Sequence, residues 1–123
     1  MTELGVKDVD ELTHAELDYM AGRAWGVVPA SLRIAQPQNV CEWRVRSGLW
    51  RRWSPLSIWS HAGEILQARM GRGDGLYRIR GKWACQFKEN GWVAESITAQ
   101  GAITKCIILE KYGETVPMLW VKE

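Results

Sequence analysis

The chain has 123 residues, of which 46% are hydrophobic and 24% are charged, and its formal net charge is +2. This composition is typical of one globular domain with an apolar core, and it excludes an intrinsically disordered chain. The sequence lacks an apolar run long enough for a transmembrane helix, and its first residues lack the apolar stretch of a signal peptide. We therefore expect a single domain over residues 1–123, located in the cytoplasm, with no membrane partner.

The two signs of charge are separated along the chain. Residues 1–18 carry six acidic residues and one lysine, whereas residues 33–82 carry ten basic residues and three acidic ones. We expect residues 1–10 to form a flexible acidic N-terminal arm. The basic middle can offer a surface to an anionic partner, or the acidic arm can lie over it. The sequence leaves both alternatives open.

The first expected element is a helix over residues 13–24. Thr13 and Glu16 have the spacing of a capping box, in which the hydroxyl and the carboxylate each accept a hydrogen bond from a free backbone amide. Apolar residues then recur at helical spacing, which predicts one narrow buried face. Gly26 follows where a helix of this length ends.

A strand and a turn are expected after an irregular segment. Two prolines and the lack of a steady period predict a loop over residues 27–42, with at most a short strand at 32–35. The sequence then alternates, so that Trp43 and Val45 point to one face of a strand and the arginines between them to the other. Ser47 and Gly48 form a turn signal.

A second helix is expected to begin at Ser54, because Pro55 is tolerated at the first helical position, and to end at Gly71. Its apolar residues fall on one face, and this pattern places Trp59 in the core. Gly63 within this helix predicts a close approach of another backbone or side chain, because glycine otherwise lowers helix stability by about 1 kcal/mol.

The last third of the chain reads as two strands, a helix and an edge strand. Asn90 and Gly91 are a strong hairpin signal between a strand over residues 76–87 and a return strand over 92–96. A third helix over residues 98–112, expected to be the most buried, ends at Gly113. A final edge strand contains Pro117. The predicted fold class is α+β, with three helices packed on a small, mostly antiparallel β-sheet.

No catalytic or metal-binding pattern stands out. The three cysteines are widely spaced and odd in number, which argues against a disulfide framework and favours small buried side chains. Ser60 and His61 are adjacent on a helix, so their side chains diverge by about 100°. The glycine-rich stretch 71–75 lacks the lysine of a phosphate-binding loop. We expect no enzyme activity, no cofactor and no metal.

The compositional outlier is residues 43–59, which contain four tryptophans and four arginines. Arginine binds phosphates and carboxylates, and exposed tryptophan can stack on bases or fill a protein interface. The predicted partner-binding residues are Arg44, Arg46, Trp50, Arg51, Arg52 and Trp53. The alternative is that Trp50 and Trp53 pack in the core, which leaves the arginines as ordinary surface charge.

Laid end to end, three segments resemble the NinX-like family of small accessory proteins from tailed bacteriophages. "ELTHAELDYMAGRAWG" is similar to the family's opening Leu-Thr pair and Leu-Asp-aromatic helix. "WSPLSIWSHAGEILQ" is similar to its Ser-Pro-Ser-x-x-Trp segment, and "GAITKCIILEKYGETVPM" to its closing helix with Glu-x-Val-x-Pro. The sequence departs from the family at Leu56, where a small residue is usual, and at Ile58, where an acidic residue is usual. The resemblance implies a phage or prophage origin, but no catalytic residues.

From these observations we expect a non-enzymatic accessory protein that binds a host or phage macromolecule, most simply a protein, in the cytoplasm of a bacterial host. Interference with a host defence system is one role of this kind. A nucleic-acid-binding module that uses the same arginines and tryptophans is the first alternative. A binder of a small anionic ligand such as a nucleotide, held by Arg69, Arg72 and helix-start amides, is the second.

Overall fold

The computed structural model describes residues 6–69, 75–88 and 91–117. The helices of this part are α1 (His14–Trp25), α2 (Trp59–Arg69) and α3 (Ala99–Tyr112). The strands are β1 (Val6–Asp8), β2 (Leu32–Ala35), β3 (Val40–Arg44), β4 (Trp50–Arg52), β5 (Gly75–Ile79), β6 (Lys82–Gln86), β7 (Ala94–Ser96) and β8 (Thr115–Pro117). Two short 3-10 helices, η1 (Val9–Glu11) and η2 (Pro29–Ser31), complete the described elements. The α+β class is confirmed.

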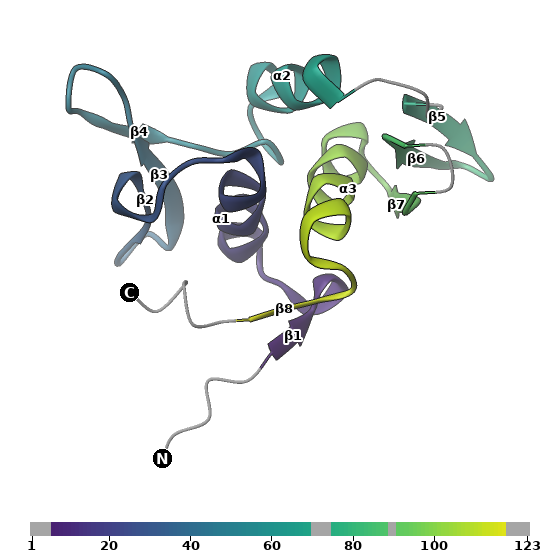
Figure 1. Cartoon of the computed structure of the whole chain (residues 1–123), viewed down its shortest axis with the longest axis horizontal. Coiled ribbons are helices and arrows are strands. Elements are labelled where there is room, and N and C mark those ends of the chain that lie inside the picture. Colours follow the sequence, from purple (N-terminus) through teal and green to yellow (C-terminus); the bar gives the residue numbers. More distant parts are fainter. Residues whose placement is uncertain (1–5, 70–74, 89–90, 118–123) are drawn as a thin grey trace.

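The strands form three antiparallel sheets, so the prediction of one sheet is wrong. Their orders are β2-β3-β4, β5-β6-β7 and β1-β8. Helices α1 and α3 pack against each other at the centre, and this pair separates the two three-stranded sheets (Figure 1). The first sheet covers the outer side of α1 and the second covers the outer side of α3, while α2 contacts α3. Each sheet buries one face on its own helix, and this arrangement replaces a single shared sheet.

Helix α1 begins and ends as expected. The Thr13 hydroxyl accepts a hydrogen bond from the Glu16 amide at 3.2 Å, and the Glu16 carboxylate accepts one from the Thr13 amide at 3.0 Å. Gly26 ends the helix in the left-handed conformation, with φ of 108°. Eight residues of α1 are buried, compared with seven in α3. The expectation that the third helix is the most buried is therefore wrong.

Helix α2 starts later than expected. Residues 54–58 form a separate turn, in which the Ile58 amide donates to the Ser54 carbonyl at 2.7 Å. The helix itself begins at Trp59, whose side chain is 51% exposed, so its predicted place in the core is wrong. A Cβ atom added to Gly63 would meet no atom within 4 Å, so that glycine permits no close approach. The predicted end of α2, at Gly71, lies outside the described residues.

The second sheet contains one more turn than expected. Arg80 and Gly81 both have positive φ, 51° and 79°, which is the geometry of a two-residue hairpin turn. The predicted strand over residues 76–87 is therefore two strands, β5 and β6, and β7 is the third strand of the meander. Of the predicted hairpin pair, Asn90 lies outside the described residues and Gly91 lies in the connection between β6 and β7.

The first and last described strands pair with each other. Val6 faces Pro117 and Asp8 faces Thr115 in the β1–β8 register. Residues 6–11 are therefore strand and 3-10 helix where a flexible acidic arm was expected, and Val9 is buried in the core. Residues 1–5 of the expected arm lie outside the described residues. The edge position of the Pro117 strand is confirmed.

The three cysteines are buried and carry free thiols, as expected. Burial raises the pKa of Cys41, and a hydrogen bond with Cys106, together with burial, raises the pKa of Cys85. Among the described residues, no three His, Cys, Asp or Glu side chains gather as a metal site. None of the described helices is long and apolar enough to cross a membrane.

Candidate binding surface on the first sheet

The register of β3 and β4 decides where the arginines of the Trp/Arg segment point. Trp43 lies opposite Arg51, and Arg44 lies opposite Trp50. Side chains of directly opposed residues lie on the same face of a sheet. Arg51 therefore shares the inner face of the sheet with Trp43. The outer face, away from α1, carries Arg44 and Trp50, and also Arg52, which lies two residues after Trp50.

A further arginine joins this outer face from β2. Two nitrogens of the Arg33 guanidinium, Nη2 and Nε, donate to Glu42 Oε1 at 2.7 and 2.9 Å. The same guanidinium lies 4.0 Å from the centroid of the Trp50 ring, a cation–π contact. Trp50 is half-buried, and one side of its ring is covered by Arg33. Trp50 is therefore a support for an arginine rather than a free stacking platform.

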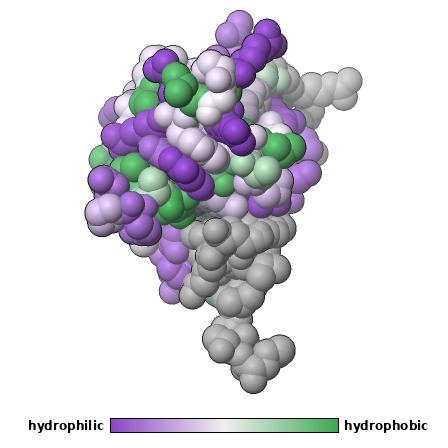
Figure 2. Space-filling view, turned by 90° about the vertical axis from the view of Figure 1, so that its left-hand side faces the viewer, coloured by the Kyte–Doolittle hydropathy of each residue, from purple (hydrophilic) through white to green (hydrophobic). Residues whose placement is uncertain are grey.

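The β3–β4 hairpin itself carries four exposed arginines, namely Arg44, Arg46, Arg51 and Arg52. Within the part of the chain that the structure describes, they form no ion pair. Glu42, which lies opposite Arg52 in the strand register, is engaged by Arg33. Figure 2 views the molecule from the side of this sheet and shows hydrophilic residues interspersed with hydrophobic ones. We define the arginine surface as Arg33, Arg44, Arg46, Arg51 and Arg52.

Two acidic residues of the N-terminal segment pair with lysines outside the arginine surface. Glu16 pairs with Lys7 at 3.0 Å, and Asp10 pairs with Lys105 at 3.5 Å. Thr13 and Lys7 hold the pKa of Glu16 below its usual value although burial acts to raise it. Glu16 and Asp10 are therefore engaged near α1 and α3, and for these two residues the second alternative left open by the sequence does not hold.

Trp53 is not a surface residue, so its predicted partner-binding role is wrong. Its side chain is 0% exposed, and its ring nitrogen Nε1 donates to the Asp18 carbonyl at 2.9 Å. The ring stacks on His61 at 4.8 Å and lies 4.5 Å from the ring of Trp43. Gly22 leaves the necessary space, because a Cβ there would lie 2.9 Å from Trp53 Nε1. Burial is possible because the polar atom has a partner.

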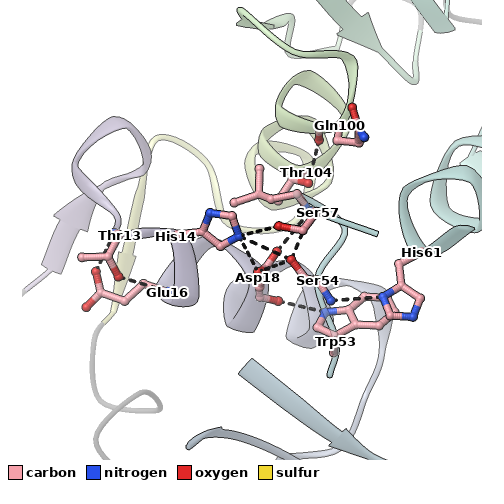
Figure 3. Close-up of polar contacts among 11 residues, drawn as sticks. Thr13, His14, Glu16, Asp18, Trp53, Ser54, Ser57, His61, Gln100 and Thr104 are labelled. Atoms are coloured by element: carbon pink, nitrogen blue, oxygen red, sulfur yellow. Dashed lines mark hydrogen bonds and ion pairs between the residues drawn. The ribbon is translucent and has the colours of Figure 1, made fainter. Parts of the chain in front are cut away.

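Next to Trp53 lies a polar cluster around the buried carboxylate of Asp18 (Figure 3). The Ser54 hydroxyl donates to Asp18 Oδ2 at 2.7 Å, and the Leu56 amide donates to Asp18 Oδ1 at 3.2 Å. His14 Nε2 lies 3.4 Å from Oδ2. These contacts attach the turn at residues 54–57 to α1. Asp18 and Ser54 come from two of the three segments that carry the family resemblance.

Burial raises the pKa of Asp18 to about 6, although hydrogen bonds from Ser54 and Leu56 and the charges of His14 and Arg52 act to lower it. The cluster is not a Ser–His–Asp relay. His14 Nε2 lies 3.1 Å from the Ser57 hydroxyl and 3.4 Å from the Asp18 carboxylate, so one nitrogen faces both groups. A relay needs a different ring nitrogen for each group. Asp18 is therefore a structural anchor.

His61, the other histidine, is engaged on its Nδ1 atom, which accepts a hydrogen bond from the Ser54 amide at 3.1 Å. Burial lowers the pKa of His61, and the nearby charge of Glu64 opposes that effect. The ring is therefore a neutral hydrogen-bond acceptor stacked on Trp53. It supports the anchor and does not act on Ser60, its neighbour in sequence.

The alternative anion site is not assembled by the described residues. The Arg69 guanidinium lies 5.9 Å from the centroid of the Trp25 ring at the end of α1. Arg72 lies outside the described residues, so this site stays a prediction. A shallow cavity of about 450 Å³ lies elsewhere, between Trp92, Val93 and Glu110. The Glu110 carboxylate accepts a hydrogen bond from the Trp92 amide at 2.7 Å, and it gives this cavity an acidic rather than a cationic lining.

Two residues of these sites were missed by the sequence reasoning. Arg33 lies outside the Trp/Arg segment, but its place in the expected strand at 32–35, beside buried Leu32, was a signal that it points outward. Asp18 gave no such signal, because its partners are 36 and 38 residues away.

In comparisons with known proteins, no protein-family model and no curated protein matches this chain.

Proposed function

We propose that this protein is a non-enzymatic accessory protein of a bacteriophage or prophage that binds a negatively charged host or phage macromolecule through the arginine surface. The observation that carries the proposal is the group of four exposed arginines on the β3–β4 hairpin that form no ion pair within the described residues. Exposed arginines match planar carboxylate and phosphate groups, to which the guanidinium can donate two parallel hydrogen bonds.

The phage origin and the cytoplasmic location in a bacterial host rest on the resemblance of the three segments to NinX-like proteins. Interference with a host defence system is the role we propose within that setting. The Asp18 anchor supports a binding protein, because it holds the hairpin on α1 without presenting an activated nucleophile. The arginine surface would act by binding its partner, and this role requires no catalysed reaction.

The test compares wild-type protein with two triple variants during capture of macromolecules from lysates of phage-infected bacteria. R44Q/R51Q/R52Q removes three charges from the arginine surface. R78Q/R80Q/K82Q removes three charges from the β5–β6 hairpin and is the matched control. We expect a stoichiometric partner with wild type and control, and at least tenfold less with the first variant. Equal recovery with all three proteins, or no partner at all, would contradict the proposal.

A further inference from the structure

The tip of the β3–β4 hairpin extends beyond the third strand of its sheet. Pairing between β2 and β3 stops at Leu32 and Trp43. Pairing between β3 and β4 continues to Arg44 and Trp50, and then the Val45 amide donates to the Leu49 carbonyl at 2.9 Å. In Figure 1 this connection projects from the body of the molecule beside β4. Residues 44–50 are therefore a two-stranded ribbon with no third strand paired at either edge.

Cationic side chains leave this ribbon in more than one direction. Arg44 lies on the outer face of the ribbon and Arg46 lies in its turn. Arg51 and Arg52 follow at its base, Arg52 on the outer face and Arg51 on the opposite face. A flat acidic protein surface can contact only one face of a ribbon. A partner with a groove lined by negative charge on both sides can contact both faces at once. The distribution of the arginines therefore favours a partner with such a groove over a partner with a flat acidic surface.

The size of the tip fits the groove of a DNA duplex. Three residues along each strand span about 10 Å at roughly 3.4 Å per residue. The major groove of B-form DNA is about 12 Å wide and about 8.5 Å deep, and it admits a two-stranded β-ribbon. Phosphates line both of its edges. The deep, narrow major groove of duplex RNA does not admit side chains in this way.

Single-stranded nucleic acid fits less well. Binding of single strands depends on aromatic rings on which bases stack. Trp50 is the aromatic residue on the outer face of the hairpin, and Arg33 covers one side of its ring at 4.0 Å. Trp53 is fully buried. The hairpin therefore offers cations without an open stacking platform.

We propose that the tip of the β3–β4 hairpin inserts into the major groove of double-stranded DNA. Arg44 and Arg52 contact one phosphate backbone, and Arg51 contacts the other. Arg46 and Leu49, which is 58% exposed, lie at the tip, where they face the base edges. This inference rests on the proposed function and names the chemical class of its partner.

The test measures fluorescence anisotropy of a labelled 20-bp DNA duplex, the matching single strand and an RNA duplex of the same sequence, at several salt concentrations. Three phosphate contacts predict a slope of log K against log[salt] of about −2.7, since each contact contributes roughly −0.9. We expect the DNA duplex to bind at least tenfold more tightly than the other two. R44Q and R51Q, which lie on opposite faces, should each make the slope shallower by about 0.9, and R78Q should leave it unchanged.

Four outcomes would overturn the inference. Equal affinity for all three nucleic acids indicates general electrostatic attraction without groove insertion. A slope that changes in R44Q but not in R51Q indicates contact through one face only. Absence of DNA binding at low salt, with a lysate protein still captured by wild type and lost in R44Q/R51Q/R52Q, rejects DNA as the partner and leaves the proposed function standing. Absence of both rejects the two proposals together.

Discussion

Residues 44–52 and residues 53–57 follow each other directly in the chain, yet the first segment presents exposed cationic side chains and the second is a buried anchor. The first carries four arginines without ion pairs, and the second carries Trp53, at 0% exposure, and the buried hydroxyl of Ser54. The difference shows that a composition rich in tryptophan and arginine does not define one surface. The partners available to each polar atom decide which residues go inside.

Trp53 and Trp59 make the same point with one residue type. The indole nitrogen of Trp53 reaches a backbone carbonyl at 2.9 Å, in the space beside Gly22, whereas Trp59 is 51% exposed at the start of α2. A buried indole needs a partner for its N–H group. Helical periodicity alone, which favoured Trp59, contains no information about that partner.

The comparison is tested most strongly by truncating the two tryptophans. Trp53→Ala should lower the free energy of unfolding by about 4 kcal/mol, because it empties a fully packed site. Trp59→Ala should change it by less than about 0.5 kcal/mol, as expected for a surface position. Urea denaturation followed by circular dichroism measures both values. Similar losses of stability in the two variants would contradict the burial of Trp53 and the exposure of Trp59.

The charge of the anchor can be tested by pH. The pKa of Asp18 is raised from 3.8 to about 6, so between pH 4 and 6 the folded protein holds a proton that the unfolded chain has released. Stability from this group is therefore present at pH 4 and is lost as the pH rises through 6. Relative to Asp18→Asn, wild type should lose about 2 kcal/mol from pH 4 to pH 7. Parallel stability curves for the two proteins would show that Asp18 titrates normally.

Two glycines test how tightly the anchor is packed. Gly22→Ala places a methyl group 2.9 Å from Leu32 Cδ2 and from Trp53 Nε1, whereas Gly63→Ala meets nothing within 4 Å. Overpacking costs about 2 kcal/mol and the gain in helix propensity returns about 1 kcal/mol. We expect a net loss of about 1 kcal/mol for the first variant and a gain of about 1 kcal/mol for the second. Thermal unfolding of both variants under the same conditions gives the difference, and equal melting temperatures would contradict the close packing.

The smallest expected effects separate the arginines themselves. Arg33→Gln removes a bond to Glu42 and the contact with Trp50, and should cost about 1 kcal/mol. Arg44→Gln should change the free energy of unfolding by less than about 0.5 kcal/mol, since its side chain has no ion pair within the described residues. If Arg44→Gln cost as much as Arg33→Gln, the surface would be structural and its availability to a partner would be in doubt.

The elements defined by local contacts were predictable from the sequence. The Thr13–Glu16 capping box and Gly26 set the two ends of α1, and the short strand at residues 32–35 was found with its observed bounds. Capping and turn chemistry act over a few residues, so a single sequence contains the necessary information. Strand alternation also predicted that Arg44 points away from the core, whereas strand β4, which carries Arg51 and Arg52, was not predicted.

The errors arose where distant residues decide the local structure. Ser54 and Pro55 read as a helix start, but the bonds from Asp18 to Ser54 and Leu56 hold them in a separate turn. The burial of Trp53 depends on Gly22 and on a carbonyl of α1. Division into three sheets depends on the packing of α1 against α3, which no local pattern encodes.

The pairing of β1 with β8 has a consequence for how the chain folds. It joins residues 6–8 to residues 115–117, so it closes a loop of more than a hundred residues. Closure of such a loop costs on the order of 4 kcal/mol in chain entropy when nothing inside it is yet ordered. The cost falls once α1 and α3 have docked and brought the ends together, so the terminal sheet should form late. Once formed, it ties the strand that precedes α1 to the strand that follows α3.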